Sequence, residues 1–194
     1  MMQSKKFAIT GGIASGKSVV LEIFRRKGFA TFSCDEISRE LWEDEGYRAG
    51  LCELFPECAP RGEIDKRALS ALVFSDEKAL MRLNAYAHPR ILQELTRRME
   101  GENIAFAEVP LLFECALEDK FDGVIAVRRG YHVRIQAART RDGLTEEEVR
   151  LRMAWQFNPA AYEKMPCDIL ENNGSLEDLE NKVEAWLKLH GVSH

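Results

Sequence analysis

The sequence has no long apolar run, no paired cysteines and no excess of positive charge. No apolar stretch approaches the roughly 20 residues of a membrane span, and no signal-peptide pattern follows the start. The five cysteines are scattered without C-x-x-C spacing, which argues against a zinc site or a disulfide framework. The net charge of −5 argues against nucleic-acid binding through bulk electrostatics. We therefore expect a cytoplasmic protein without a membrane or nucleic-acid partner.

Apolar segments that alternate with helical patterns predict an α/β fold. The strand-like segments are residues 7–10, 29–33, 103–107, 123–127 and 167–171. Strands separated by helices indicate a parallel sheet covered on both faces, with ligands beyond the carboxyl ends of the strands. We expect the second strand beside the first. At 194 residues the chain suits one domain with insertions.

Two stretches interrupt this alternation. Residues 45–102 have helical patterns around a polar turn at 60–63 and suit an insertion that binds the substrate. Residues 128–157 are dense in arginine and suit a mobile helical lid over phosphates. The remaining core comprises residues 5–44, 103–127 and 158–194. An amphipathic pattern over residues 176–189 predicts a closing helix.

Residues 11–18, GGIASGKS, fit the phosphate-binding pattern G-x-x-x-x-G-K-[ST] between a strand-like and a helical segment. Backbone N–H groups of such a turn and the positive end of the helix converge on a phosphate. In this pattern Lys17 reaches the outer phosphates and the Ser18 hydroxyl coordinates Mg²⁺. The residues expected around ATP are Gly11, Gly12, Ile13, Ala14, Ser15, Gly16, Lys17, Ser18 and Val19. The chain is therefore predicted to bind a nucleoside triphosphate.

Two acidic side chains close strand-like segments. Asp35 follows the second segment, where a carboxylate can take the proton of an attacking hydroxyl or help to hold Mg²⁺. Asp35 equally suits a helix N-cap. Glu108 follows the third segment, where an acidic residue commonly holds the water shell of the metal. Leu111 and Leu112, shortly after it, suit core packing.

Further motifs, in order along the chain, resemble those of the dephospho-CoA kinase family. After the loop come DEISREL at 35–41, GEIDKR at 62–67, Val73-Phe74 and His88-Pro89. VPLLFE at 109–114, Arg141-Asp142-Gly143, Gln156 and Asn172-Asn173-Gly174 complete the set. The matches cover nearly the whole chain, and the Pro-Leu-Leu-Phe-Glu segment is rare in other phosphate-loop kinases.

The resemblance implies a three-layer phosphate-loop kinase fold with a five-stranded parallel sheet. It also implies transfer of the ATP γ-phosphoryl group to the ribose 3′-hydroxyl of dephospho-CoA, the final step of coenzyme A biosynthesis. By similarity Asp35 is the catalytic base, Lys17 and Mg²⁺ hold the transferring group, and Arg139 and Arg141 close over it. The partners are then ATP and dephospho-CoA, and we expect a monomer or a weak homo-oligomer.

The resemblance also assigns residues to each ligand. Those implied for the acceptor are Asp35, Arg39, His88, Pro110, Leu111, Leu112 and Glu114. Arg139, Asn172 and Gly174 are implied on the ATP side, and Ser18 and, through water, Glu108 at Mg²⁺. Two alternatives stay open: Asn172 to Gly174 suit an ordinary turn, and Pro89 suits the first turn of a helix that His88 merely precedes.

Four positions depart from the family pattern. Ala14 replaces a usual glycine, and we expect its φ to be negative so that the methyl group is tolerated. Ser33 stands where the family often has an aspartate, which leaves Asp35 as the single carboxylate of that pair. Glu108 replaces an aspartate. Ala137 stands at an arginine position of the lid, for which Arg134 or Arg139 is expected to compensate.

Two other classes of function remain open. Another small-metabolite kinase, of the nucleoside or shikimate type, would share the loop, but the Pro-Leu-Leu-Phe-Glu segment and the insertion argue against it. A nucleotide switch of the GTPase class needs an Asn-Lys-x-Asp segment, which the sequence lacks.

We predict that Asp35→Ala keeps ATP affinity and loses most turnover, because the base acts on the acceptor hydroxyl. Lys17→Ala is expected to damage both quantities, because Lys17 contacts the phosphates. Nucleotide titration and a coupled ADP-release assay measure them separately. Near-normal turnover of the Asp35 variant would contradict its role as the base.

Overall fold

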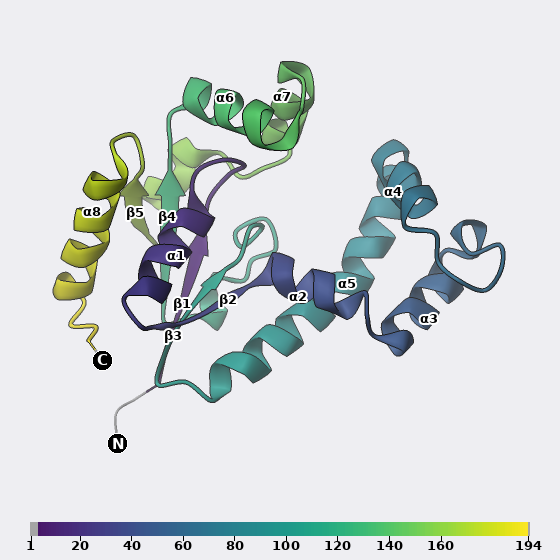
Figure 1. The fold of residues 1–194 in the computed structure, drawn as a ribbon, viewed down its shortest axis with the longest axis horizontal. Coiled ribbons are helices and arrows are strands. Elements are labelled where there is room, and N and C mark those ends of the chain that lie inside the picture. Colours follow the sequence, from purple (N-terminus) through teal and green to yellow (C-terminus); the bar gives the residue numbers. More distant parts are fainter. Residues whose placement is uncertain (1–3, 194) are drawn as a thin grey trace. The chain divides into compact units, whose positions relative to one another are not determined.

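Five parallel strands form the sheet of the fold in a computed structural model that describes residues 4–193 (Figure 1). They are β1 (Lys5–Thr10), β2 (Ala30–Ser33), β3 (Ile104–Glu108), β4 (Gly123–Arg128) and β5 (Asp168–Glu171). Their order is β2-β3-β1-β4-β5, and every pairing is parallel. The predicted α/β class is confirmed.

The order of the strands corrects one expectation. β2 does not lie beside β1, because β3 lies between them: Ile9 of β1 and Ser33 of β2 are both opposite Glu108. The last four residues of β1 are buried, whereas the first three of β2 are partly exposed. Continuous burial suits the centre of a parallel sheet, and partial exposure suits its edge. The carboxyl ends of β1, β3 and β4 therefore meet at one edge of the sheet.

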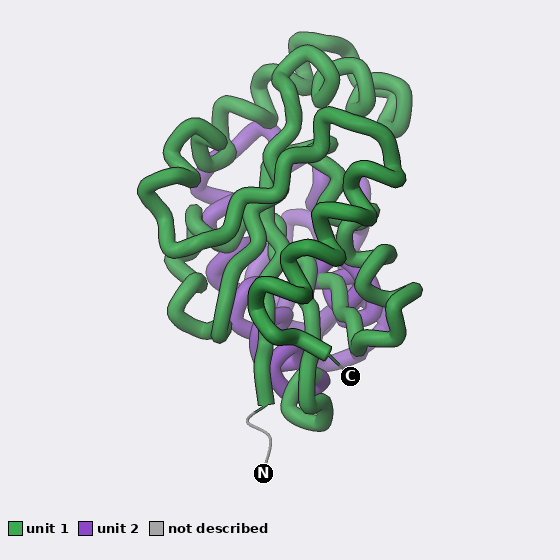
Figure 2. The backbone as a smooth tube through the Cα atoms, turned by 90° about the vertical axis from the view of Figure 1, so that its left-hand side faces the viewer, with its two compact units in different colours: residues 1–33, 99–194 green, residues 34–98 purple. Residues whose placement is uncertain are grey.

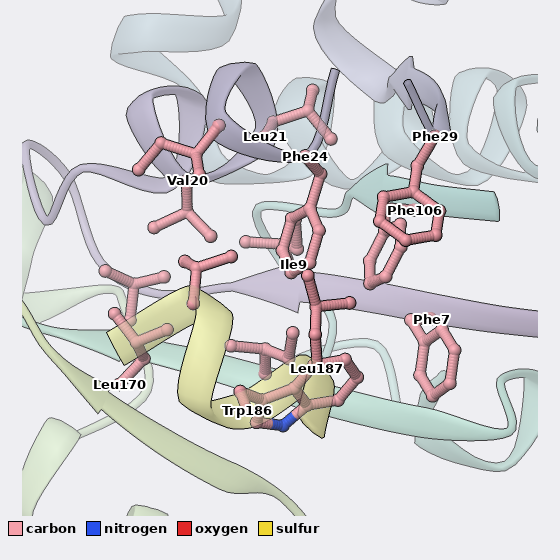
Figure 3. Close-up of a cluster of buried hydrophobic side chains, with 14 of the residues drawn as sticks. Phe7, Ile9, Val20, Leu21, Phe24, Phe29, Phe106, Leu170, Trp186 and Leu187 are labelled. Atoms are coloured by element: carbon pink, nitrogen blue, oxygen red, sulfur yellow. The ribbon is translucent and has the colours of Figure 1, made fainter. Parts of the chain in front are cut away.

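Two helices pack against the sheet through an aromatic core (Figure 3). They are α1 (Lys17–Arg26) and α8 (Leu176–Leu189), the latter with the predicted bounds. Phe24 of α1 stacks on Phe106 of β3 with 3.7 Å between the ring centroids, and Trp186 of α8 meets Phe7 of β1 edge-on at 5.1 Å. Leu176 departs from the expected apolar stripe and is 54 % exposed, because it is the first residue of its helix.

The arginine-rich stretch forms two short helices, α6 (Tyr131–Asp142) and α7 (Glu146–Ala154). Gly143 ends α6 in the left-handed conformation with a φ of 67°. Thr145 and Glu148 form a reciprocal capping box that starts α7. A 3-10 turn at Pro159–Lys164 follows α7, and another at Glu118–Lys120 precedes β4.

The chain divides into two compact units (Figure 2). Unit 1 contains the sheet and comprises the described residues up to Ser33 and from Met99 onward. Unit 2, Cys34–Arg98, has its own core around Leu51 and Phe55. Its elements are α2 (Cys34–Leu41), α3 (Glu45–Leu54), a 3-10 turn (Pro56–Cys58), α4 (Lys66–Ser75) and most of α5 (Glu77–Glu100). Unit 2 therefore holds most of the expected insertion together with α2, which the sequence pattern places in the core.

Pro89 lies inside α5. The alternative that Pro89 stands in the first turn of a helix is therefore wrong. The apolar pattern of Leu83, Ala87 and Ile91 continues across it at four-residue spacing and packs into the core of unit 2. That packing outweighs the hydrogen bond that a proline removes from a helix interior. No helix within residues 4–193 combines the length and the apolar character needed to cross a membrane.

Candidate nucleotide-binding site

The loop between β1 and α1 has a backbone that requires glycine at two places. Gly11 has a φ of 146° and Gly16 a φ of 101°, both in the left-handed region. A Cβ atom on Gly11 would lie 2.5 Å from the carbonyl oxygen of Val127, and one on Gly16 would lie 2.1 Å from Asn172 Nδ2. The two glycines therefore let β4 and the residue after β5 approach the loop closely.

The N-terminus of α1 is uncapped. Gly16 is its N-cap residue, and no side chain accepts a hydrogen bond there. The first N–H groups of a helix have no intrahelical acceptor, and the helix dipole is positive at this end. Ser15 is 1 % exposed, and its Oγ atom has no hydrogen-bond partner among the described residues. An orphaned hydroxyl beside an uncapped helix end fits an oxygen-rich anion such as phosphate.

Ile13 is held on both sides of its backbone. Its N–H donates to Gln156 Oε1 at 2.7 Å, and its carbonyl oxygen accepts from Arg134 Nε at 2.8 Å. Arg134 belongs to α6 and is 4 % exposed, and burial lowers the pKa of its guanidinium group. A Cβ atom on Gly12 would lie 2.1 Å from Arg134 Nη2, so the guanidinium lies directly against this glycine. The arginine-rich stretch therefore contacts the loop itself.

Two further side chains bind carbonyl groups of the loop. Lys17 Nζ donates to the carbonyl oxygen of Gly12 at 3.2 Å, and Asn172 Nδ2 donates to that of Ser15 at 2.8 Å. Asn172 directly follows β5 and is 9 % exposed. Its side chain therefore supports the loop. The sequence pattern Asn172-Asn173-Gly174, which suits an ordinary turn, gives no indication of this contact. The place of Asn172 near adenine stays a prediction.

Ala14 adopts a conformation opposite to the one expected. Its φ is 55°, so the expected negative φ is wrong. The loop keeps a left-handed turn here, which costs a residue with a Cβ atom about 1–2 kcal/mol. Ile13 and Ala14 pack against the buried side chains of Ile135, Ala138 and Val149. This apolar contact, which glycine would not make, offsets part of the strain.

Ser18 and Glu108 meet where β3 ends. Ser18 Oγ donates to Glu108 Oε1 at 3.1 Å, and Glu108 is 5 % exposed. Hydroxyl and carboxylate oxygens are ligands of the kind that Mg²⁺ prefers. Residues 4–193 contain no group of three or more His, Cys, Asp or Glu side chains that could hold a metal ion. This pair therefore fits an ion that keeps several waters and binds phosphate oxygens.

Comparison with known proteins identifies the family. The family model for dephospho-CoA kinase matches residues 6–178. A dephospho-CoA kinase of Thermus thermophilus is 40 % identical over 185 residues, which cover 92 % of this chain and 88 % of that protein. The chain belongs to the dephospho-CoA kinase family.

Solved structures agree with the predicted kinase fold. The crystal structure of TT1252 from Thermus thermophilus has a TM-score of 0.85 at 34 % identity, covering 99 % of this chain and 100 % of that one. Shikimate kinase from Acinetobacter baumannii has a TM-score of 0.60 at 14 % identity, covering 99 % of this chain and 97 % of that one. At so low an identity the second likeness shows the fold alone. The predicted family and fold are confirmed, and a shikimate-type kinase is not favoured.

The VPLLFE segment at residues 109–114 is mostly buried or half-buried. Leu112 is 0 % exposed, and Phe113 packs against Phe157 and Tyr162 with ring centroids 5.1 and 5.7 Å away. Glu114 Oε1 accepts from the N–H of Phe157 at 2.7 Å. Pro110 and Leu111 are half-buried. The segment is thus tied to the chain that follows α7.

The two arginines expected to close over ATP are exposed in this structure. Arg139 has a side-chain exposure of 54 % and lies 3.9 Å from Glu146. Arg141 donates to both carboxylate oxygens of Asp142 at 2.7 and 2.9 Å, and this hydrogen bonding lowers the pKa of Asp142. Of the two arginines expected to compensate for Ala137, Arg134 is the buried one in α6 and contacts the loop, whereas Arg139 is exposed. The position of Arg134 between Val133 and Ile135 was a weak signal of its burial.

The acceptor residues of unit 2 lie on helices. Asp35 is the second residue of α2. It therefore does not occupy the N-cap position, which was the alternative interpretation of this residue. Arg39 Nε donates to the backbone carbonyl of Asp35 at 3.2 Å and not to its carboxylate. His88 of α5 is half-buried, and burial lowers its pKa, which keeps the imidazole neutral at physiological pH.

We predict that Asn172→Ala costs about 1–3 kcal/mol of stability, because the carbonyl of Ser15 loses its donor in a buried site. ATP affinity should fall as well, since the loop loses a support. Urea unfolding and titration with a fluorescent ATP analogue measure the two effects. Asn181→Ala, the same change at an exposed position of α8, is the matched control. Unchanged stability and affinity in the Asn172 variant would refute the supporting role.

Proposed function

We propose that the protein transfers the γ-phosphoryl group of ATP to the ribose 3′-hydroxyl of dephospho-CoA and releases coenzyme A and ADP. The observation that carries this proposal is the phosphate loop, whose carbonyl groups are bound by side chains and which leads into a helix N-terminus without a side-chain cap. The chain that contains this loop belongs to the dephospho-CoA kinase family. The loop supports the donor half of the reaction, and the family supports the acceptor half.

On the donor side, the loop supplies hydrogen-bond donors to the triphosphate. N–H groups of the first turn of α1 and the orphaned Ser15 hydroxyl can bind phosphate oxygens. Arg129 contributes a second buried donor without a partner among the described residues, its Nε atom. Lys17 adds charge beside the loop, where its Nζ already binds Gly12. These groups neutralise the phosphates and align the γ-phosphorus for attack.

Ser18 and Glu108 would hold Mg²⁺, Ser18 directly and Glu108 through water. Bound Mg²⁺ neutralises charge on the β- and γ-phosphate oxygens. The hydrogen bond of 3.1 Å between the two residues fixes the direction of the Ser18 hydroxyl. The contact between Glu108 and Ser18 supports this role, although Glu108 replaces the usual aspartate of the family.

On the acceptor side, Asp35 takes the proton of the attacking 3′-hydroxyl. The O–H bond breaks as the new O–P bond forms, and the bond from the γ-phosphorus to the β-phosphate oxygen breaks to release ADP. The Arg39 side chain binds the backbone of Asp35, which leaves the carboxylate for this role. The resemblance to the family also implies Arg39, His88, Pro110, Leu111 and Glu114 on the acceptor side, whereas Leu112 is 0 % exposed and packs in the core.

The exposed guanidinium groups of Arg139 and Arg141 close over the phosphates when both substrates are bound. Closure would exclude water that otherwise hydrolyses ATP. The protein would work in the cytoplasm as a monomer or a weak homo-oligomer.

The purified protein is expected to release ADP from MgATP in the presence of dephospho-CoA, and far more slowly with nucleosides or shikimate. A coupled ADP-release assay over this panel of acceptors, with detection of coenzyme A by mass, measures the preference. Faster phosphorylation of another acceptor would overturn the proposal.

Glu108→Gln should raise the Mg²⁺ concentration needed for half-maximal activity by about 10–100-fold, the usual cost of losing a residue that orients a metal ligand. The substitution keeps the size of the side chain and removes its charge. Mg²⁺ titration of the ADP-release rate measures the change, with Glu102→Gln at an exposed position as the control. An unchanged Mg²⁺ requirement would remove Glu108 from the metal site.

A further inference from the structure

The two peptide planes on either side of Ala14 are each bound by an arginine. The plane between Ile13 and Ala14 contains the Ile13 carbonyl oxygen, which accepts from Arg134 Nε at 2.8 Å. The next plane contains the Ala14 carbonyl oxygen, which lies 3.5 Å from Arg129 Nη1 and accepts from it. The orientations of these planes define φ and ψ of Ala14. Its left-handed conformation is therefore fixed by contacts from outside the loop.

Gln156 closes a ring of hydrogen bonds around Ile13. Its Oε1 atom accepts from the Ile13 N–H at 2.7 Å and from Arg134 Nη2 at 3.4 Å. Arg134 in turn binds the Ile13 carbonyl, so both backbone polar groups of one residue are held. We call Arg134 and Gln156 the Ile13 clamp. Both members come from the arginine-rich stretch, more than 100 residues away along the chain.

The clamp requires a charged guanidinium group to be buried, which costs free energy that a neutral structural contact would not cost. Arg134 is 4 % exposed, and no carboxylate among the described residues forms an ion pair with it. A buried cation bound only by neutral oxygens is expensive unless an anion lies nearby. The phosphate loop it touches is the place where an anion binds. The buried charge therefore belongs to the nucleotide site.

Ala14 explains why such a clamp is needed. A glycine at this position adopts a φ of 55° at no steric cost, whereas alanine is strained there. Strained residues persist when the surrounding structure determines their conformation. Ile13 and Ala14 also pack on the apolar cluster of Ile135, Ala138 and Val149, which gives the same peptide a further contact.

We infer that Arg134 and Gln156 are positioning residues of the nucleotide site, which impose on Ala14 the left-handed conformation that the phosphate loop needs. They act through the backbone of Ile13 and not by contact with the reacting atoms. The inference rests on the proposed function only in requiring ATP binding, and not on the identity of the acceptor.

A double-mutant cycle between positions 134 and 14 tests this inference. Arg134→Met keeps the length of the side chain and removes its donors. It should weaken binding of a fluorescent ATP analogue about tenfold in the natural background, the usual scale for a hydrogen bond to a charged group. In the Ala14→Gly background, where the left-handed turn is intrinsically available, the loss should shrink to less than about threefold. Each loss is measured against its own background, so any effect of Ala14→Gly alone cancels from the comparison.

Steady-state kinetics of the same variants distinguish an effect on ATP binding from an effect on the chemical step. Arg134→Met should raise KM for ATP more than it lowers kcat, and Ala14→Gly should restore KM. Gln156→Met removes the acceptor of the Ile13 N–H and should show the same rescue by glycine. Arg150→Met, the same substitution at an exposed arginine of α7, should change none of these quantities.

Equal losses of affinity in the alanine and glycine backgrounds would overturn the inference, because the two sites would then be independent. Circular dichroism and thermal unfolding identify a variant that fails to fold, in which case the Gln156 arm decides. If the protein binds ATP and shows this coupling but does not phosphorylate dephospho-CoA, the inference about Arg134 and Gln156 stands and the proposed acceptor is wrong.

Discussion

The site depends on one constraint, which is that the carbonyl groups of the phosphate loop are bound by protein side chains. The successive acceptors are the carbonyl oxygens of Gly12, Ile13, Ala14 and Ser15, and their donors are Lys17, Arg134, Arg129 and Asn172. A peptide plane whose C=O is held in one direction presents its N–H in the other. Three of the four donors are cationic, so they also favour an anion beside the loop. The loop backbone is therefore held in place by the protein itself, which suits a preorganised anion site of the kind proposed.

The order of the strands brings these donors to one place. β1 leads into the loop and lies between β3 and β4, with β5 beyond β4. Glu108 ends β3, Arg129 follows β4, and Asn172 follows β5. Side chains that are far apart in sequence thus meet at the edge where the strands end, as expected for an open parallel sheet. The aromatic core beneath the sheet fixes the strands and, through them, the loop.

The parts predicted correctly from the sequence are those that local patterns determine. The loop motif, the five strands and the bounds of α8 follow from the spacing of glycine and apolar residues within a few positions. The strand order and the role of Asn172 did not follow, because each depends on contacts across the fold; Asn172 and Ser15 are separated by 157 positions. The conformation of Ala14 was missed for a related reason. Its methyl group argues locally for a negative φ, and only distant side chains reverse that preference.

Arg134 shows why family membership does not determine how a site is supported. The phosphate-binding motif itself keeps Gly11, Gly16, Lys17 and Ser18. The groups that bind the outer side of the loop need only hold its backbone, and any donor of suitable reach can do so. At this level the chain departs from the family pattern at Ala14 and Ala137, and Arg134 binds the loop backbone next to Ala14. A strained alanine in the loop and a buried cation against it are each unfavourable alone. In the inferred arrangement, the contact from Arg134 holds Ala14 in a conformation that a glycine would adopt without strain, and a bound phosphate would offset the buried charge.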